Sequence, residues 1–392
     1  MSFMNDYINR KMTISGLESE LLRLISEYNK LKGEYLFVYS AAIGKPIQGI
    51  ALEQSDFYVI RDLLTNQKDN KKLTIYIETP GGSGETAEEI VRFLHNNFDT
   101  VSFIVSGEAK SAGTIIVLSG DEIIMTETGS LGPIDAQIKI GRSTVSAYDY
   151  IEWVKEKQKE AEVQGRLNPF DASIVAQITP GELSGVLHAL EFAKELVIEW
   201  LVKYKFKNWI VTETRKLPVS EELKENRAKE IAEELANHSK WRLHGRSIKI
   251  DDLDKIGLRV TRVDNDPVLS EIIYRIQTVC RLLFESTTVF KIFATQDNKI
   301  FRHAVQTVAP VRVPQTKSPD VIQIEPKCPK CGTIHKIYAK LDPNPQIDLD
   351  FESKGFKPFP KNAKITCDCG FEIDLLGIKN QIEIDTGRKI VD

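Results

Sequence analysis

Short apolar runs alternate with amphipathic segments over residues 72–131 of this chain. The continuous runs LTIYIET and TVSFIV are typical of buried strands, and GETAEEIVRFLHNN between them places apolar residues at helical spacing. Strands that alternate with helices predict right-handed βαβ crossovers and a mostly parallel sheet. We therefore expect an α/β fold with a functional site at the carboxyl ends of the strands, where such sheets form their sites.

The same patterns predict the remaining elements. Further strands are expected in YLFVYSAAIG, DEIIMTETGSLG and STTVFKIFAT, and further helices over residues 15–31, 54–64 and 269–284 and in SAGTIIVLSG. Residues from about 147 to 240 are mainly helical and highly charged, which predicts an inserted helical arm. SIKIDDLDKIGLRVTRVD predicts a strand, a helical turn and another strand.

The chain has 392 residues, more than one compact core usually holds, so several domains are expected. We predict an N-terminal amphipathic helix (1–34), a main domain (35–308) that includes the helical arm, and a linker (309–325) in the proline-rich VAPVRVPQTKSPDVIQIEP. A small domain of short strands (326–392) follows and carries four of the five cysteines.

Charge and hydropathy narrow the classes of function. A net charge of −4 gives no general attraction to nucleic acid or anionic membrane. No stretch approaches the roughly 20 apolar residues that span a bilayer, and the first residues lack the zones of a signal peptide. We therefore expect a cytoplasmic protein without a membrane span. The fifth cysteine, Cys280, lies in an apolar stretch and is expected to be a small buried residue.

Two turns could carry chemistry. TPGGSGE follows a strand and opens a helix, so the N–H groups of Gly81 and Gly82 could hold an anion, although a plain strand-to-helix turn is the simpler interpretation. In GEAKSAGT, small neighbours would let a carbonyl reach Ser111 at the start of a helix. The alternative for Ser111 is an ordinary N-cap serine.

A PGG turn followed about thirty residues later by a serine flanked by small residues resembles the Clp protease and signal peptide peptidase clan. TPGGSGETAEEIVRFL, AKSAGTIIVLSGDEIIM, LGPIDAQ and KWRLHGRSIKIDDLDKIGLRV are similar to motifs of its serine dehydrogenase proteinase family. The resemblance covers residues 20–262. It implies a ClpP/crotonase-like spiral fold, Ser111 as nucleophile, and an oxyanion hole formed by Gly82 and Ala112. Members of that family usually begin with a membrane-spanning segment and lack the cysteine domain, and this chain differs in both respects.

The general base stays open at this stage. The position of the Clp histidine reads PIDAQ here, with Asp135 near the place, whereas signal peptide peptidases use a lysine. Lys194 is the first candidate because apolar neighbours on its helix could lower its pKa by desolvation. His244 is the second because it falls at the histidine position of the family's closing motif, and His188 is a weaker one. Lysines 155, 157 and 159 are expected to be solvated.

Four cysteines near the C-terminus form two close pairs, which in a reducing compartment favour a metal over disulfides. The pairs are CPKCG, with Cys328 and Cys331, and CDCG, with Cys367 and Cys369. Four thiolates fit a tetrahedral structural Zn²⁺ site in a zinc-ribbon-like domain, which would leave no open position for catalysis. No organic cofactor is expected.

The patterns and the resemblance together indicate an intracellular serine peptidase that acts on protein or peptide substrates through a Ser111 acyl-enzyme. Two alternatives remain. One is a catalytically idle ClpP-like scaffold whose zinc domain binds protein or nucleic acid, and the other is a crotonase-like acyl-CoA enzyme. Relatives of the fold assemble into rings or smaller oligomers, so a homo-oligomer is also expected.

Overall fold

A computed structural model describes residues 2–67, 70–140, 143–212, 215–304 and 320–391. The chain divides into two compact units, residues 1–305 and 306–392.

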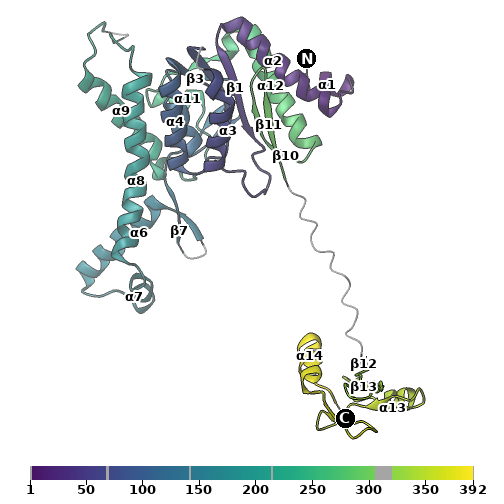
Figure 1. The fold of residues 1–392 in the computed structure, drawn as a ribbon. Helices are drawn as coiled ribbons and strands as arrows, with labels where there is room; N and C mark the ends of the chain where they lie inside the picture. The colour runs from purple at the N-terminus through teal and green to yellow at the C-terminus, as the bar shows by residue number, and fades with distance from the viewer. Residues whose placement is uncertain (1, 68–69, 141–142, 213–214, 305–319, 392) are drawn as a thin grey trace. The chain divides into compact units, whose positions relative to one another are not determined.

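The first unit is built on a seven-stranded sheet with the order β11-β10-β1-β2-β3-β5-β9 (Figure 1). Strands β1 to β9 of this sheet pair in parallel, whereas β10 pairs antiparallel with both β1 and β11. The strands are β1 (Tyr35–Ala41), β2 (Lys72–Glu78), β3 (Thr100–Val105), β5 (Glu122–Met125), β9 (Thr261–Arg262), β10 (Val289–Ala294) and β11 (Lys299–His303). The expected mostly parallel α/β sheet is confirmed.

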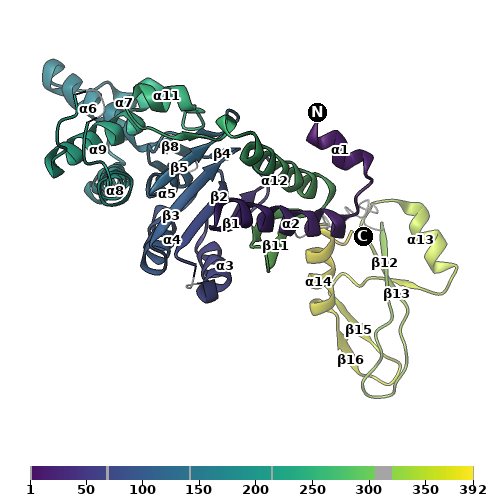
Figure 2. The same ribbon diagram turned by 90° about the horizontal axis from the view of Figure 1, so that it is seen from above.

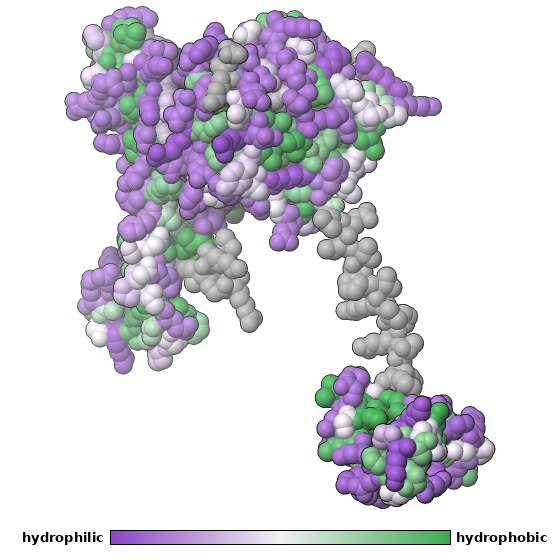
Figure 3. Space-filling view, in the orientation of Figure 1, coloured by the Kyte–Doolittle hydropathy of each residue, from purple (hydrophilic) through white to green (hydrophobic). Residues whose placement is uncertain are grey.

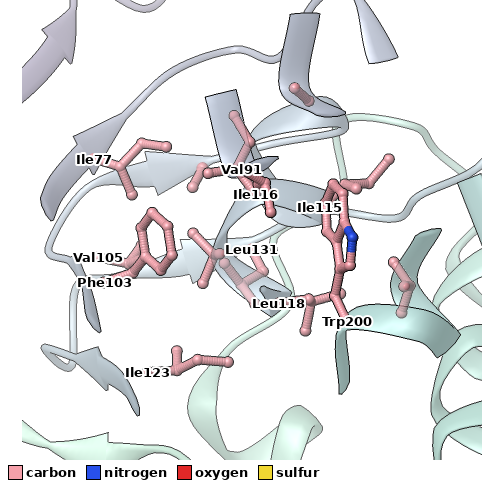
Figure 4. Packing of buried hydrophobic residues seen from close by; sticks show 14 of the residues in the cluster. Ile77, Val91, Phe103, Val105, Ile115, Ile116, Leu118, Ile123, Leu131 and Trp200 are labelled. Carbon is pink, nitrogen blue, oxygen red and sulfur yellow. The ribbon is translucent and has the colours of Figure 1, made fainter. Parts of the chain in front are cut away.

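Helices cover both faces of this sheet (Figure 2). Side chains alternate between the faces along each strand, so Leu36 packs with one layer and Phe37 with the other. The first layer holds α1 (Phe3–Asn9), α2 (Ile14–Lys32) and α12 (Pro267–Ser286), and the second holds α3 (Gln54–Leu64), α4 (Gly84–Asn97) and α5 (Ala112–Leu118). Figure 4 shows the second layer, where Phe103 and Val105 lie near Ile116 and Leu118 of α5.

The N-terminal helix is part of this core. Leu21, Leu24 and Ile25 of α2 are fully buried and pack with residues of α12 and the sheet. The amphipathic stripe seen in the sequence is thus the inner face of one layer, and α2 belongs to the same unit as the sheet.

Beyond their carboxyl ends, the parallel strands continue into a second layer of short strands. The strands β4 (Glu108–Ala109) and β6 (Ser130–Leu131) pair in parallel, and Thr79 bridges Ala109. The chain thus contributes a long and a short strand in β3 and β4 and again in β5 and β6, which fits the expected ClpP/crotonase-like spiral. The turns of the candidate site lie within this second layer.

The helical arm follows β6. It contains β7 (Gln137–Ile140), β8 (Ser143–Ser146), α6 (Ala147–Gln164), α7 (Pro169–Val175), α8 (Pro180–Trp200), a π-helical turn (Leu201–Lys205), α9 (Glu221–Ala236), α10 (His238–Trp241) and α11 (Ile250–Lys255). Short 3₁₀ turns occupy Thr65–Gln67 and Val263–Asn265. The buried residues of α8, α9 and α11 pack with the second helical layer of the sheet, so these helices extend the main core.

The second unit contains β12 (Val321–Ile324), β13 (Ile337–Lys340), α13 (Pro345–Glu352), β14 (Lys357–Pro358), β15 (Lys364–Thr366), β16 (Glu372–Asp374) and α14 (Leu376–Thr386). Val321–Ile324 lies in the segment that the sequence assigned to a linker, but it pairs with β13 as a strand. The earlier part of the predicted linker, residues 309–319, lies outside the described residues. Within the described part of the chain, no helix is both long and apolar enough to cross a bilayer.

Candidate active site

Ser111 lies in the turn between β4 and α5, with a backbone that few non-glycine residues adopt. Its φ is 50° and its ψ is −120°, a conformation that costs on the order of 1–3 kcal/mol. Although Ser111 occupies the N-cap position of α5, its side chain makes no capping hydrogen bond. The ordinary N-cap interpretation is therefore wrong for this serine.

Gly81 of the PGG turn packs directly against the serine. A Cβ atom on Gly81 would lie 2.7 Å from Cβ of Ser111 and 2.6 Å from the carbonyl oxygen of Lys110, so only glycine fits there. The N–H of Gly81 donates to Oγ1 of Thr79 at 3.2 Å. Gly81 consequently provides space beside Ser111, and its N–H already has a partner, so its role as an oxyanion donor stays a prediction.

Gly82 is held by a bridge to Leu52 that leaves its own N–H free. The N–H of Leu52 donates to the carbonyl of Gly81 at 2.7 Å, and the N–H of Ser83 donates to the carbonyl of Leu52 at 3.0 Å. Among the described residues, the N–H groups of Gly82 and Ala112 have no hydrogen-bond partner. Both are thus available to an anionic ligand near Ser111.

A cavity of about 600 Å³ joins these groups. Its walls come from the glycine turn, the Ser111 turn, the segment after β6, and one face of α8. The lining residues are Gly82, Ser83, Gly84, Glu85, Ser111, Ala112, Ile115, Ile134, Asp135, Ala136, Gln137, Gly185, His188, Ala189, Phe192 and Ala193. The apolar residues of this set form part of the cavity wall beside Ser111.

Asp135 is a buried carboxylate in the same cavity and binds two histidines. One carboxylate oxygen accepts from Nδ1 of His244 at 2.8 Å, and the other accepts from Nδ1 of His238 at 3.1 Å. Burial acts to raise the pKa of Asp135, but the hydrogen bonds and charges of the two histidines outweigh it, so the pKa is lowered from its ordinary value. Asp135 is therefore held as a carboxylate.

The two histidines differ in whether Nε2 of the ring has a partner. Nε2 of His238 lies 3.1 Å from a carboxylate oxygen of Asp149, so both of its ring nitrogens are engaged. No described residue forms a hydrogen bond with Nε2 of His244. Of the pair, His244 is therefore the one that keeps a ring nitrogen without a hydrogen-bond partner among the described residues.

The lysine candidates lie elsewhere. Lys194 lines a separate cavity of about 210 Å³, whereas its neighbour Ala193 faces the Ser111 cavity. No lysine lines the Ser111 cavity in the described part of the chain. Lys157 is not solvated as expected, because it pairs with Asp171 at 2.8 Å.

Lys110 precedes the nucleophile and points its amine away from the cavity lining. Its Nζ donates to Oγ of Ser247 at 2.9 Å and also contacts the carbonyls of Leu131 and Arg246 and Oγ of Ser130. Burial lowers the pKa of Lys110 to about 8. These contacts tie the Ser111 turn to the segment that follows His244.

Comparisons with known proteins find a family match in the first unit. Residues 40–167, about a third of the chain, match the family described as ClpP-like SDH-type serine proteinase. The matched segment contains Gly82, Ser111 and Asp135, whereas His244 and the cysteine unit lie outside it.

Two uncharacterised proteins of Methanocaldococcus jannaschii are similar to parts of this chain. One is 37% identical over 89 residues and the other 33% identical over 97 residues. The matches cover 23% and 24% of this chain and 30% and 32% of those proteins, so the chain spans about a third of the length of these relatives.

Solved structures similar to this chain include two mutants of the 1510-N membrane-bound stomatin-specific protease, one of them in complex with a substrate peptide. Both are 15% identical to it. The first covers 57% of this chain and 79% of its own, with a TM-score of 0.33, and the second covers 64% and 80%, with a TM-score of 0.31.

Two features of the candidate site could not be predicted from the sequence. The sequence pattern indicated no role for His238, and it placed Asp135 near the site without its two histidine partners. Their shared signal was weak, because the residues that meet lie 103 and 109 positions apart in the chain. The only local sign of these contacts was an aspartate, Asp135, directly after the apolar segment LGPI.

The four cysteines of the second unit converge as the sequence predicted. Their sulfur atoms all lie within 4.8 Å of one another, with 3.7 Å between Cys328 and Cys369 and 3.5 Å between Cys331 and Cys367. Gly332 and Gly370 follow the two pairs with φ of 80° and 79° and close tight turns. Four thiolates so placed could bind a metal ion. His335 is not among the clustered groups.

Proposed function

We propose that this chain is a serine peptidase in which Ser111 is the nucleophile, His244 the general base and Asp135 the residue that orients the base. The N–H groups of Gly82 and Ala112 form the oxyanion hole. The observation that carries the proposal is the meeting of Ser111, two unpaired N–H groups and a buried carboxylate on one cavity. The family's description as serine proteinases supports the same chemistry.

His244 is preferred over the other bases for a geometric reason. A general base must be held in one orientation and one tautomer, and the bond from Nδ1 of His244 to Asp135 does both, leaving Nε2 as the acceptor. His188 lines the cavity, but no described residue forms a hydrogen bond with it. Lys194 lines a different cavity.

In the proposed reaction these groups act in turn. Oγ of Ser111 attacks the scissile carbonyl carbon as Nε2 of His244 takes its proton, and the carbonyl oxygen becomes an oxyanion held by the N–H groups of Gly82 and Ala112. The imidazolium, stabilised by Asp135, then protonates the leaving amine. Water resolves the acyl-enzyme by the same route. Each oxyanion donor is expected to contribute about 3 kcal/mol of transition-state stabilisation, and the base about 10²–10⁴-fold in rate.

The nucleophile is tested by labelling with a fluorophosphonate probe. We expect the wild-type chain to be labelled and Ser111→Ala to be unlabelled, with turnover of casein or a peptide lost in parallel. Ser106→Ala is the matched control, because Ser106 is buried and bonds Gln277 outside the cavity. Equal labelling of Ser111→Ala and the wild type would contradict the assignment.

The general base is tested by comparing four variants that all keep Ser111. His244→Gln and Asp135→Asn should lower kcat by roughly 10²–10⁴-fold, whereas His188→Gln and Lys194→Met should stay within a few-fold of the wild type. A loss confined to Lys194→Met or His188→Gln would identify that residue as the base instead. Absence of labelling and turnover in the wild type, together with a nucleic-acid shift, would favour the idle scaffold, and measurable coenzyme A binding would favour the crotonase-like alternative.

We also propose that the cysteine cluster holds a structural Zn²⁺. Zn–S bonds of about 2.3 Å in a tetrahedron separate sulfur atoms by about 3.8 Å, close to the separations of 3.7 Å and 3.5 Å found here. Four thiolates would fill the coordination sphere, so the ion would stabilise the second unit. One equivalent of zinc is expected in the purified protein and much less in Cys367→Ser. Equal zinc in both proteins would contradict the site.

A further inference from the structure

The oxyanion donor Gly82 depends on a loop from another part of the chain. Residues 51–53 pass beside the PGG turn, and Leu52 exchanges two backbone hydrogen bonds with Gly81 and Ser83. The approach is very close: a Cβ atom on Gly82 would lie 2.3 Å from the carbonyl oxygen of Leu52. Any displacement of Leu52 would therefore move the Gly82 N–H as well.

A buried ion pair anchors this loop. Lys291 of β10 is fully buried, and its Nζ donates to the carbonyl of Ala51 at 2.7 Å and to the carboxylate of Asp56 at 2.6 Å. The same carboxylate accepts from the N–H of Glu53 at 3.0 Å. One ammonium group and one carboxylate thus hold the residues on both sides of Leu52.

Among the described residues, the remaining partners of Asp56 form no hydrogen bond to the backbone of residues 51–53. Arg302 of β11 lies 3.0 Å from the other carboxylate oxygen, and the hydroxyl of Tyr39 donates to Asp56 at 3.3 Å. The side chain of Arg302 is 23% exposed, whereas those of Lys291 and Asp56 are fully buried. Arg302 neutralises the carboxylate, but only Lys291 and Asp56 bond the backbone on either side of Leu52.

We propose that Lys291 and Asp56 are positioning residues for the oxyanion hole. They fix Leu52, and through the Leu52 bridge they fix the direction of the Gly82 N–H. This inference rests on the proposed function, since it assigns the two residues to the same Ser111 site. A displacement of about 1 Å in such a donor can cost about 100-fold in rate.

The buried ion pair of Lys291 and Asp56 is expected to add little net stability, which suits a positioning role. Two charges removed from water gain little net stability, and apolar replacements of similar size are often as stable. Lys291 stands in the otherwise apolar stretch VFKIFA of β10, where every residue is buried. A methionine would fill the same space in the sheet, but it could not bond the carbonyl of Ala51.

The test compares Lys291→Met with Arg302→Met in the full chain. Both remove one cationic partner of Asp56, but only the first removes the bond to Ala51. We expect Lys291→Met to lower kcat for a peptide substrate by about 10–100-fold, with KM within about two-fold, and to slow fluorophosphonate labelling equally. Arg302→Met should keep kcat within about three-fold of the wild type.

Urea unfolding of each variant is the control that shows whether it is folded. If Lys291→Met is unfolded, the double variant Asp56→Asn with Lys291→Met replaces it, because it leaves no unpaired carboxylate, and the same loss of kcat is expected. Folded variants with wild-type kcat, or equal losses in Lys291→Met and Arg302→Met, would overturn the proposal. These outcomes require an active wild type, so they are distinct from a failure of the Ser111 assignment, in which the wild type itself is not labelled.

Discussion

The backbone of Ser111 is held in a conformation that a glycine adopts at lower cost. Its positive φ places the hydroxyl at the edge of the cavity instead of over the N–H groups of α5, where a capping serine would lie. Strain of this kind persists only where the surroundings impose it. Gly81 packs against Ser111, and hydrogen bonds hold the side chain of the adjacent Lys110.

This strain leads to a prediction about two inactive variants. Ser111→Gly should be more stable than Ser111→Ala by about 1 kcal/mol, because glycine accepts the positive φ without a Cβ clash. Urea unfolding of both proteins measures the difference. If the two unfold at the same urea concentration, the turn is not strained.

Sequence spacing was sufficient to single out Ser111 and Gly82 as candidates, because both lie in local turns that a short motif describes. The general base was harder to predict from the sequence. The apolar neighbours of Lys194 show that its helix packs, but they do not show which cavity the lysine reaches. The link between His244 and Asp135 depends on the docking of distant segments, which no local pattern reports.

Helices and strands were predicted best where a single pattern of apolar positions covered the whole segment. The helix over Gln54–Leu64 has the predicted bounds, and the strands of the parallel sheet lie where the apolar runs placed them. The predicted linker failed in Val321–Ile324, because flanking prolines suggested an extended connection while the short apolar segment pairs with β13. Pairing partners of a four-residue strand are set by tertiary contacts.

His95 connects three elements and should make the first unit acid-sensitive. It lies in the last turn of α4, donates from Nε2 to the carbonyl of Ser119 after α5, and stacks on Tyr204 at 3.5 Å. Burial lowers the pKa of His95 to about 4. An unfolded histidine titrates near 6.5, so the unfolded chain binds more protons between these values, and stability falls as the pH drops from about 6.5 to 4.

The expected loss is up to about 3 kcal/mol of unfolding free energy between pH 7 and pH 4. This loss should be absent from His95→Gln, because glutamine does not titrate. The difference in unfolding free energy between the wild type and His95→Gln should therefore shrink as the pH falls. Urea unfolding at both pH values measures this difference. Parallel pH profiles for the two proteins would show that His95 is not the sensitive group.

At the scale of the whole molecule, the two units should respond differently to chelation. The cysteine cluster lies entirely within residues 306–392, whereas the core and the Ser111 cavity lie within residues 1–305. A strong zinc chelator should lower the unfolding temperature of the second unit and leave that of the first unchanged. Calorimetry and fluorophosphonate labelling of the same samples test this, and a loss of labelling on chelation would contradict the separation.

The expected homo-oligomer can be tested at the helical arm. The surface around α6 and α7 mixes apolar and hydrophilic residues (Figure 3), and Val163 and Phe170 are 78% and 74% exposed. We expect light scattering at micromolar concentration to report an assembly, and Phe170→Glu to weaken it. A monomeric wild type would contradict this expectation.

The anchor of the Leu52 loop has a consequence for synthesis of the chain. Lys291 and Arg302 belong to β10 and β11, the last strands of the first unit to leave the ribosome, whereas Gly82 and Ser111 emerge nearly two hundred residues earlier. If the anchor orients the oxyanion donor, a nascent chain carries its nucleophile through most of translation without a competent site. The order of the strands would then act as a built-in delay that protects neighbouring nascent chains from premature cleavage.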